Sequence, residues 1–123
     1  MTESQSSQYI IIDTHGGNED VVAIVHAIRV AEVLGIKILG ITCTNGIRTL
    51  EKAVDDALVA NKIANAKIPI FKGSKQSILL NSNYPKTVNQ PCNYDTLDAL
   101  YCKLVKEEDR ALIQSKSAIK FIA

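Results

Sequence analysis

The sequence lacks the features that would assign a nucleic-acid or membrane partner. Fourteen basic and thirteen acidic residues leave a net charge of +1, so the composition gives no basic surface for nucleic acid. No apolar run reaches the roughly 20 residues that cross a bilayer. The opening MTESQSSQ has neither the basic nor the apolar region of a secretory signal. We therefore expect a cytoplasmic protein with no nucleic-acid or membrane partner, in which residues 1–8 form a flexible leader.

Several catalytic and metal-binding motifs are also missing. Cys43, Cys92 and Cys102 are odd in number and show no C-x-x-C spacing, which is typical of reduced structural thiols in the cytosol. The sequence has no G-x-S-x-G, so the segment His15-Gly16-Gly17 is not interpreted as the oxyanion hole of an acyl hydrolase. The stretch HGGNED matches neither G-x-G-x-x-G nor a P-loop.

The sequence does contain alternating strand-like and helix-like segments. YIIID, residues 9–13, is a short β-branched run of the kind that forms strands covered on both faces in parallel sheets. A helix is predicted from Asp20 to Leu34, because the apolar residues are dense and Gly35 supplies a stop. IKILGITCT, residues 36–44, is the next predicted strand.

A second helix and a third strand continue the alternation. Thr49 is a candidate N-cap, and KIPIFKG, residues 67–73, is the third strand, with Pro69 acceptable near its start. One helical face is apolar at positions Leu50, Ala53, Val54, Ala57 and Leu58. The order β-α-β-α-β predicts an α/β protein with a Rossmann-like open parallel sheet and flanking helices.

The remaining sequence is less regular. Residues 80–96 contain two prolines and four asparagines and are predicted to form a long loop. Residues 97–123 predict one or two helices. The chain stops in an apolar stretch without a capping signal, so we expect residues 9–123 to form a single domain that is an incomplete version of a larger fold.

Acidic side chains and a histidine follow the first predicted strand. In open parallel sheets, ligands bind outside the carboxyl ends of the strands, where Asp13, His15, Glu19 and Asp20 are expected to converge. Carboxylates at such a place suit a hard divalent cation. The alternative is that Asn18 or Asp20 only caps the helix while Glu19 interacts with its dipole.

Three segments carry a resemblance to a known family. IIIDTHGGNEDVVAIVHAI resembles the signature of the inosine-uridine preferring nucleoside hydrolases, whose first strand ends in Asp-x-Asp-Pro-Gly-x-Asp-Asp. Asp13, Gly17 and Asp20 match this signature, and Glu19 is a glutamate at a position where the signature has an aspartate. ILGITCTNGIRTLEKAVDDALVANKIA resembles the second strand, Gly-Asn turn and following helix of the family, and IPIFKGSKQSILL resembles its third strand. The resemblance covers residues 9–80 and implies the nucleoside hydrolase fold.

The resemblance implies hydrolysis of the N-glycosidic bond of ribonucleosides, with Ca²⁺ holding the ribose hydroxyls and a water. Asp20 would be a metal ligand, Asp13 a supporting acid and Glu19 an acceptor for a ribose hydroxyl. The Ca²⁺ would orient the attacking water and lower its pKa. His15 stands in the place of the aspartate that binds calcium and acts as the base. Imidazole is a poor calcium ligand but can act as a general base.

Two further departures concern the substrate. Ile47 stands where the family has a ribose-binding asparagine, and Asn45 is the nearest replacement. His26, the other histidine, is expected to be a packing or surface residue. The family's later site residues have no counterpart in the sequence. Two hypotheses follow: a nucleoside hydrolase with weak calcium binding and changed activity, or a truncated, non-catalytic remnant that serves as a binding module. An exposed sheet edge would favour homo-oligomers in either case.

Overall fold

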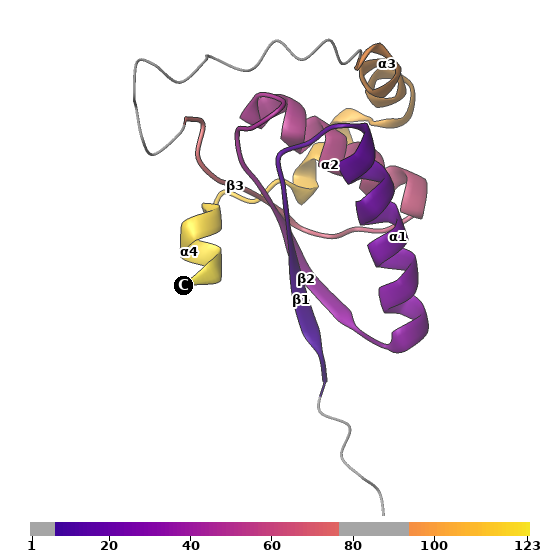
Figure 1. The fold of residues 1–123 in the computed structure, drawn as a ribbon, viewed down its shortest axis with the longest axis vertical. Coiled ribbons are helices and arrows are strands. Elements are labelled where there is room, and N and C mark those ends of the chain that lie inside the picture. Colours follow the sequence, from indigo (N-terminus) through magenta and orange to yellow (C-terminus); the bar gives the residue numbers. More distant parts are fainter. Residues whose placement is uncertain (1–6, 77–93) are drawn as a thin grey trace, which may run out of the picture.

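The sheet has three parallel strands. A computed structural model describes residues 7–76 and 94–123 of the chain. Strands β1 (Tyr9–Thr14), β2 (Lys37–Cys43) and β3 (Ile70–Lys72) pair in the order β1-β2-β3 (Figure 1). The open parallel sheet with flanking helices confirms the predicted α/β fold. No helix within residues 7–76 and 94–123 is long and apolar enough to cross a membrane.

Helices α1 (Asn18–Leu34) and α2 (Leu50–Ala64) connect the strands. Both predicted end signals are confirmed: Gly35 adopts a left-handed φ of 69° after α1, and the side chain of Thr49 accepts a hydrogen bond from the backbone N–H of Lys52. α1 begins at Asn18, two residues before the predicted start at Asp20, without a side-chain cap. Neither Asn18 nor Asp20 therefore acts as the hydrogen-bonding cap considered above.

The core lies between the sheet and these two helices. The predicted apolar face of α2 is buried at all five positions, and α1 contributes Val21, Ile24 and Ile28. Asn61 is also buried on α2, where its side chain accepts from Ile68 N and donates to Ala57 O. These two bonds satisfy a buried amide and fix the chain as it enters β3.

Strand β1 is an edge strand, and the prediction that it is covered on both faces is wrong. Tyr9 and Ile11 keep 56% and 41% of their surface exposed. Within residues 7–76 and 94–123, β1 has one strand partner, β2. The sheet face opposite α1 and α2 is covered by α4 (Ala118–Ile122) at β3, where Phe121 stacks on Phe71 with ring centroids 3.7 Å apart. A β-branched run is therefore compatible with a half-covered edge as well as with a fully buried strand.

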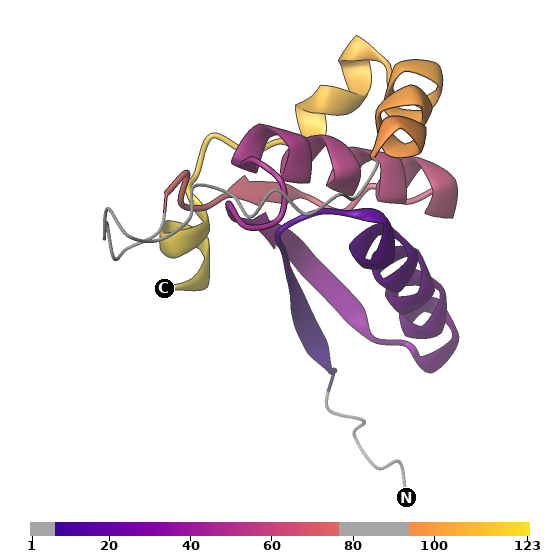
Figure 2. The same ribbon diagram turned by 45° about the horizontal axis from the view of Figure 1, so that its top comes forward.

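The C-terminal region forms three short helical segments rather than the expected one or two. Helix α3 (Asp95–Leu104) and the 3₁₀ helix η1 (Glu107–Leu112) pack on α2 (Figure 2). Ile113 then bridges to Ile70 of β3 in parallel. Because α3 starts at Asp95, the last two residues of the predicted loop 80–96 are helical. The rest of that loop up to residue 93, and residues 1–6 of the predicted leader, lie outside the described residues.

Candidate functional site

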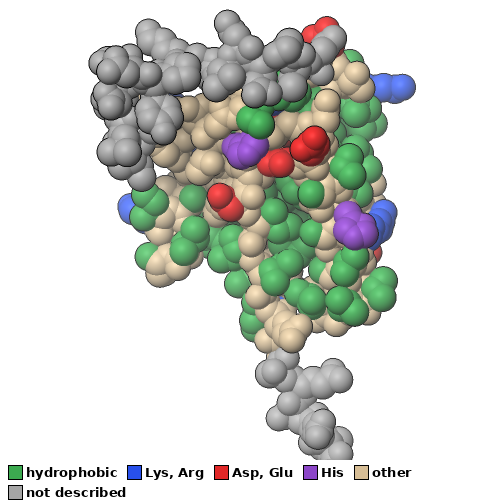
Figure 3. Space-filling view, viewed as in Figure 1, with side chains coloured by type: hydrophobic (Ala, Val, Ile, Leu, Met, Phe, Trp, Pro, Cys, Tyr) green, Lys and Arg blue, Asp and Glu red, His purple; other side chains and the backbone are tan. Residues whose placement is uncertain are grey.

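The β1–α1 loop, residues 15–17, lies at the carboxyl end of β1. Gly16 and Gly17 both have positive φ, 81° and 108°. A Cβ on Gly16 would lie 2.8 Å from Asp56 Oδ2 and 3.0 Å from Ala53 Cα, so only glycine fits between the loop and α2. Figure 3 shows Asp, Glu and His side chains gathered on this end of the molecule. The loop is thus held against α2 by close packing of backbone.

Asp20, on the first turn of α1, lies beside His15 of the loop. The buried hydroxyl of Thr14 donates to Asp20 Oδ2 at 2.6 Å and accepts from Gly16 N at 3.0 Å. His15 Nδ1 lies 4.0 Å from the same Asp20 oxygen, and the two side chains are 45% and 31% exposed. His15 Nδ1 finds no hydrogen-bond partner within residues 7–76 and 94–123. Thr14, which sequence reasoning missed, therefore orients the acid next to a partly exposed imidazole whose Nδ1 atom is buried.

Asp13 points to a different place. Its Oδ1 accepts a hydrogen bond of 2.7 Å from the hydroxyl of Thr42 on β2. Successive side chains of a strand point to opposite faces, so Asp13 and the neighbouring Thr14 diverge. Asp20, held by Thr14, is on the other side of β1 from Asp13.

Glu19 is exposed on α1 and contributes, with Val22 and His26, to a shallow apolar hollow on the outer side of that helix. No group of three or more His, Cys, Asp or Glu side chains able to hold a metal occurs among the described residues. The described side chains therefore do not assemble the joint site expected for Asp13, Glu19 and Asp20.

The donor set can be compared with the Ca²⁺ that the family resemblance implies. Calcium takes six to eight oxygen ligands. At the loop, Asp20 offers one carboxylate whose Oδ2 already accepts from Thr14, and its neighbour His15 offers nitrogen. These described residues do not fit a calcium ion.

The turn after β2 contacts the loop. A Cβ on Gly46 would lie 2.6 Å from His15 Cβ, so this turn packs against the histidine. Asn45 is half-buried and its backbone N–H donates to Ser74 O at 3.0 Å. Ile47 is exposed. Asn45 is therefore adjacent in the chain to Gly46, which lies against His15.

A buried ionic cluster lies next to the loop, and sequence reasoning missed it. Arg48 Nη2 donates to Asp56 Oδ1 at 3.1 Å and to Asp98 Oδ1 at 2.7 Å. Arg48 Nε lies 2.9 Å from Asp56 Oδ2, but its N–H makes no hydrogen bond to any of the described residues. The guanidinium lies 4.7 Å from the ring centroid of Tyr94, a cation–π distance.

The carboxylates of this cluster differ in their pKa. Burial raises the pKa of Asp56, although a hydrogen bond from Gly17 N and the charge of Arg48 act against it. The hydrogen bond from Arg48 lowers the pKa of Asp98, which is more exposed. One sequence signal pointed to Asp56: it lies three residues after Ala53, at the border of the apolar face of α2.

The thiol of Cys43 lies at the carboxyl end of β2. Cys43 is fully buried, and burial first, then the charges of Asp13 and Asp56, raises its pKa to about 12. A thiol with this pKa stays protonated and unreactive at neutral pH. Cys43 therefore fits the predicted structural role, whereas Cys102 is exposed and Cys92 lies outside the described residues.

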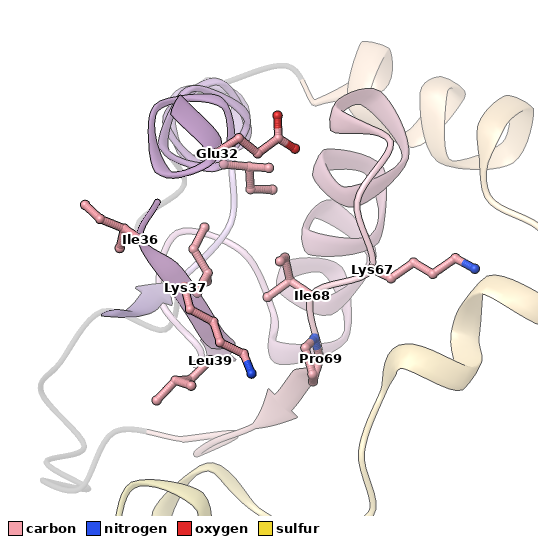
Figure 4. Close-up of a pocket in the computed structure, with 9 residues that line it drawn as sticks. Glu32, Ile36, Lys37, Leu39, Lys67, Ile68 and Pro69 are labelled. Atoms are coloured by element: carbon pink, nitrogen blue, oxygen red, sulfur yellow. The ribbon is translucent and has the colours of Figure 1, made fainter. Parts of the chain in front are cut away.

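A groove of about 500 Å³ lies at the opposite, amino ends of β2 and β3 (Figure 4). Its walls come from the end of α1, the start of β2 and the segment before β3, including Ile36, Lys37 and Ile68. None of the candidate site residues named above lines it. The groove is therefore separate from the β1–α1 loop.

Comparison with known proteins now identifies the family. No curated protein sequence matches the chain significantly. The family model for the inosine-uridine preferring nucleoside hydrolases matches residues 10–122, a span that includes β1 from its second residue, the loop with His15, and the helices of the described residues. The chain belongs to the inosine-uridine preferring nucleoside hydrolase family.

Proposed function

We propose that this chain is a nucleoside hydrolase-like protein in which hydrolysis of ribonucleosides to free base and ribose is impaired or lost. The observation that carries the proposal is the separation of its acids. Thr14 holds Asp20 and Thr42 holds Asp13, on opposite faces of β1. A hydrolytic site needs its metal, water and sugar contacts in one small volume, because misplaced groups lose most of their effect.

The residues that remain are assigned by position. His15 is the proposed catalytic base, since a neutral imidazole can take a proton from water. Glu19 and Asn45 are proposed to bind the ribonucleoside, and Asp20 is proposed as the metal ligand, with Asp13 supporting it only indirectly through β1, because the two side chains lie on opposite faces of the strand. Because the donors described above do not fit calcium, we expect its binding to be weak or absent.

His15 has a geometric limit as a base. Its Nδ1 is 4.0 Å from Asp20 Oδ2, beyond hydrogen-bond distance, and that oxygen already accepts from Thr14. Asp20 therefore does not hold the imidazole in one tautomer, as the third member of a catalytic triad would. This supports a low rate of proton transfer.

A base-release assay tests the proposal. Purified chain is incubated with inosine or uridine, with and without Ca²⁺, and free base is measured chromatographically. The expected result is no release above the protein-free rate. Metal-dependent release that Asp20→Ala abolishes would contradict the proposal. Asp109→Ala, which changes an acid on η1, serves as the control.

The alternative is a non-catalytic binding or interaction module. It is supported by the exposed edge of β1, where Tyr9, Ile10 and Ile11 are accessible and the outer backbone groups of the strand have no strand partner among the described residues. We propose self-association through this edge, in a cytoplasmic setting without nucleic-acid or membrane partners. Size-exclusion chromatography tests it: a monomer at every concentration would count against the module.

A further inference from the structure

We infer that Arg48 and Asp56 are positioning residues that join helix α3 to the β1–α1 loop, so that the loop is ordered only while α3 is docked. Arg48 precedes α2 and is in contact with carboxylates on two helices, Asp56 of α2 and Asp98 of α3. This coupling between the docking of α3 and the order of the loop does not depend on whether the chain hydrolyses nucleosides.

The contact with the loop is made by Asp56. Its Oδ2 accepts a hydrogen bond of 2.9 Å from Gly17 N, and Gly17 is the residue before the first turn of α1. The same oxygen lies 2.8 Å from where a Cβ on Gly16 would be. Asp56 is thus the acceptor that fixes the backbone between His15 and α1.

The contact with α3 is made through Arg48. Asp98 and Tyr94, at the start of α3, hold the guanidinium from one side by an ion pair of 2.7 Å and a ring contact. Tyr94 also reaches the loop, since its Cε1 lies 3.6 Å from where a Cβ on Gly17 would be. Arg48 and Tyr94 therefore lie between α3 and the loop.

The coupling follows from the burial of the pair. The side chains of Arg48 and Asp56 are 6% and 2% exposed, and a buried carboxylate keeps its charge only while it is paired. If α3 leaves, Arg48 loses Asp98 and Tyr94, and water reaches Asp56. The bond from Gly17 to Asp56 then competes with hydration.

A second ionic contact between the C-terminal region and α2 provides a matched control. Arg110 of η1 donates to Asp55 of α2 at 3.2 Å and to the hydroxyl of Tyr101 at 2.6 Å. This contact resembles the Arg48 cluster in its chemistry. It involves neither Gly16 nor Gly17, so its loss should not reach the loop.

Backbone amide hydrogen exchange, measured by NMR on the full chain, tests the coupling. In Asp98→Asn, which changes a side chain with no contact to the loop, the Gly17 amide should exchange about threefold faster or more, as should the amides of α3. Exchange in the buried core of α2 should stay within about twofold. In Asp55→Asn, the Gly17 amide should be unchanged. An unchanged Gly17 amide in Asp98→Asn, or equal acceleration in both variants, would overturn the inference.

A double substitution separates positioning from general stability. Arg48→Met with Asp56→Leu replaces a buried ion pair by apolar side chains, a change that proteins often tolerate. The protein should unfold cooperatively, yet exchange at Gly17 and in α3 should be at least tenfold faster than in the unsubstituted chain. Gly17 protection equal to that of the unsubstituted chain would overturn the positioning role.

Discussion

Two acid–base pairs flank the glycines of the β1–α1 loop, and they differ in almost every respect. His15 and Asp20 lie 4.0 Å apart and are 45% and 31% exposed. Arg48 and Asp56 approach to 2.9 Å and are 6% and 2% exposed. The first pair is partly exposed, although His15 Nδ1 itself is buried, and its members make no hydrogen bond to each other. The second is inaccessible and holds the backbone around it.

The comparison teaches that charge at this end of the sheet serves two purposes. A buried ion pair such as Arg48–Asp56 holds the backbone around it in place. Removing one member is costly because the other charge remains buried without a partner. A pair in contact with water contributes little to stability, so its residues can change without loss of the fold. The departure from the family signature at position 15 is on the accessible side.

The largest expected effect comes from breaking the buried pair. Arg48→Met leaves Asp56 buried without its cation, which should lower the free energy of unfolding by about 3–5 kcal/mol. Arg110→Met is the matched control, because its partner Asp55 is partly exposed, and should cost about 1 kcal/mol or less. Urea unfolding of both variants measures the difference. Equal losses of unfolding free energy in the two variants would contradict the distinction between the buried Arg48–Asp56 pair and the more exposed Arg110–Asp55 pair.

A smaller effect is expected from filling the space beside Asp56. Gly16→Ala forces a side chain into a left-handed backbone and against Asp56 and Ala53, which should cost about 3 kcal/mol from strain and overpacking together. Gly35→Ala has a similar φ but no atom within 4 Å of the added Cβ. It should cost only about 1 kcal/mol. Thermal melts compare them, and an equally mild Gly16→Ala would show that the loop is not packed on α2.

The smallest effect concerns pH. The pKa of Asp98 lies below its ordinary value of 3.8, chiefly through the hydrogen bond from Arg48. Its contribution to stability is therefore present above that value and is lost as the pH falls through the lowered pKa. Asp56, with a raised pKa, acts in the opposite direction: its contribution is present below the ordinary value and falls as the pH rises.

Asp98→Asn should therefore weaken the loss of stability on acidification. Because Asp98 is 41% exposed, the change should stay below about 1 kcal/mol. Unfolding free energies measured between about pH 2 and 7 provide the test. A steeper acid dependence in Asp98→Asn than in the unsubstituted chain would contradict the assigned sign.

The regular elements could be predicted because their signals are local. The five apolar positions of α2 repeat with the helix period, and Thr49 and Gly35 mark helix ends by their own chemistry. The exposure of β1 could not be read from its isoleucines, because coverage depends on which other elements lie beside the strand. Local sequence specifies the element, and its neighbours determine its burial.

The candidate site was predicted only in part. His15 and Asp20 come from one short loop and the helix turn after it, so their proximity is a local feature. Asp13 diverges from Thr14 by strand alternation, which the expectation of four converging side chains did not take into account. The Arg48 cluster joins residues that are 8 and 50 positions apart. No local pattern indicates contacts of such separation, and a charged residue before a helix is usually exposed.

The central proposal, that the β1–α1 loop is an altered form of the family's metal site, is tested most directly by calcium titration. Isothermal calorimetry compares the unsubstituted chain with His15→Asp, and a base-release assay accompanies it. We expect weak or undetectable calcium binding in the unsubstituted chain. In His15→Asp, calcium should bind about tenfold more tightly or better, since even residues that only hydrogen-bond to a metal ligand change metal affinity by that amount. Base release should remain absent in both, because a metal alone does not orient the sugar. Equal calcium affinity in the two proteins would mean that position 15 does not face the ion, and would contradict the account.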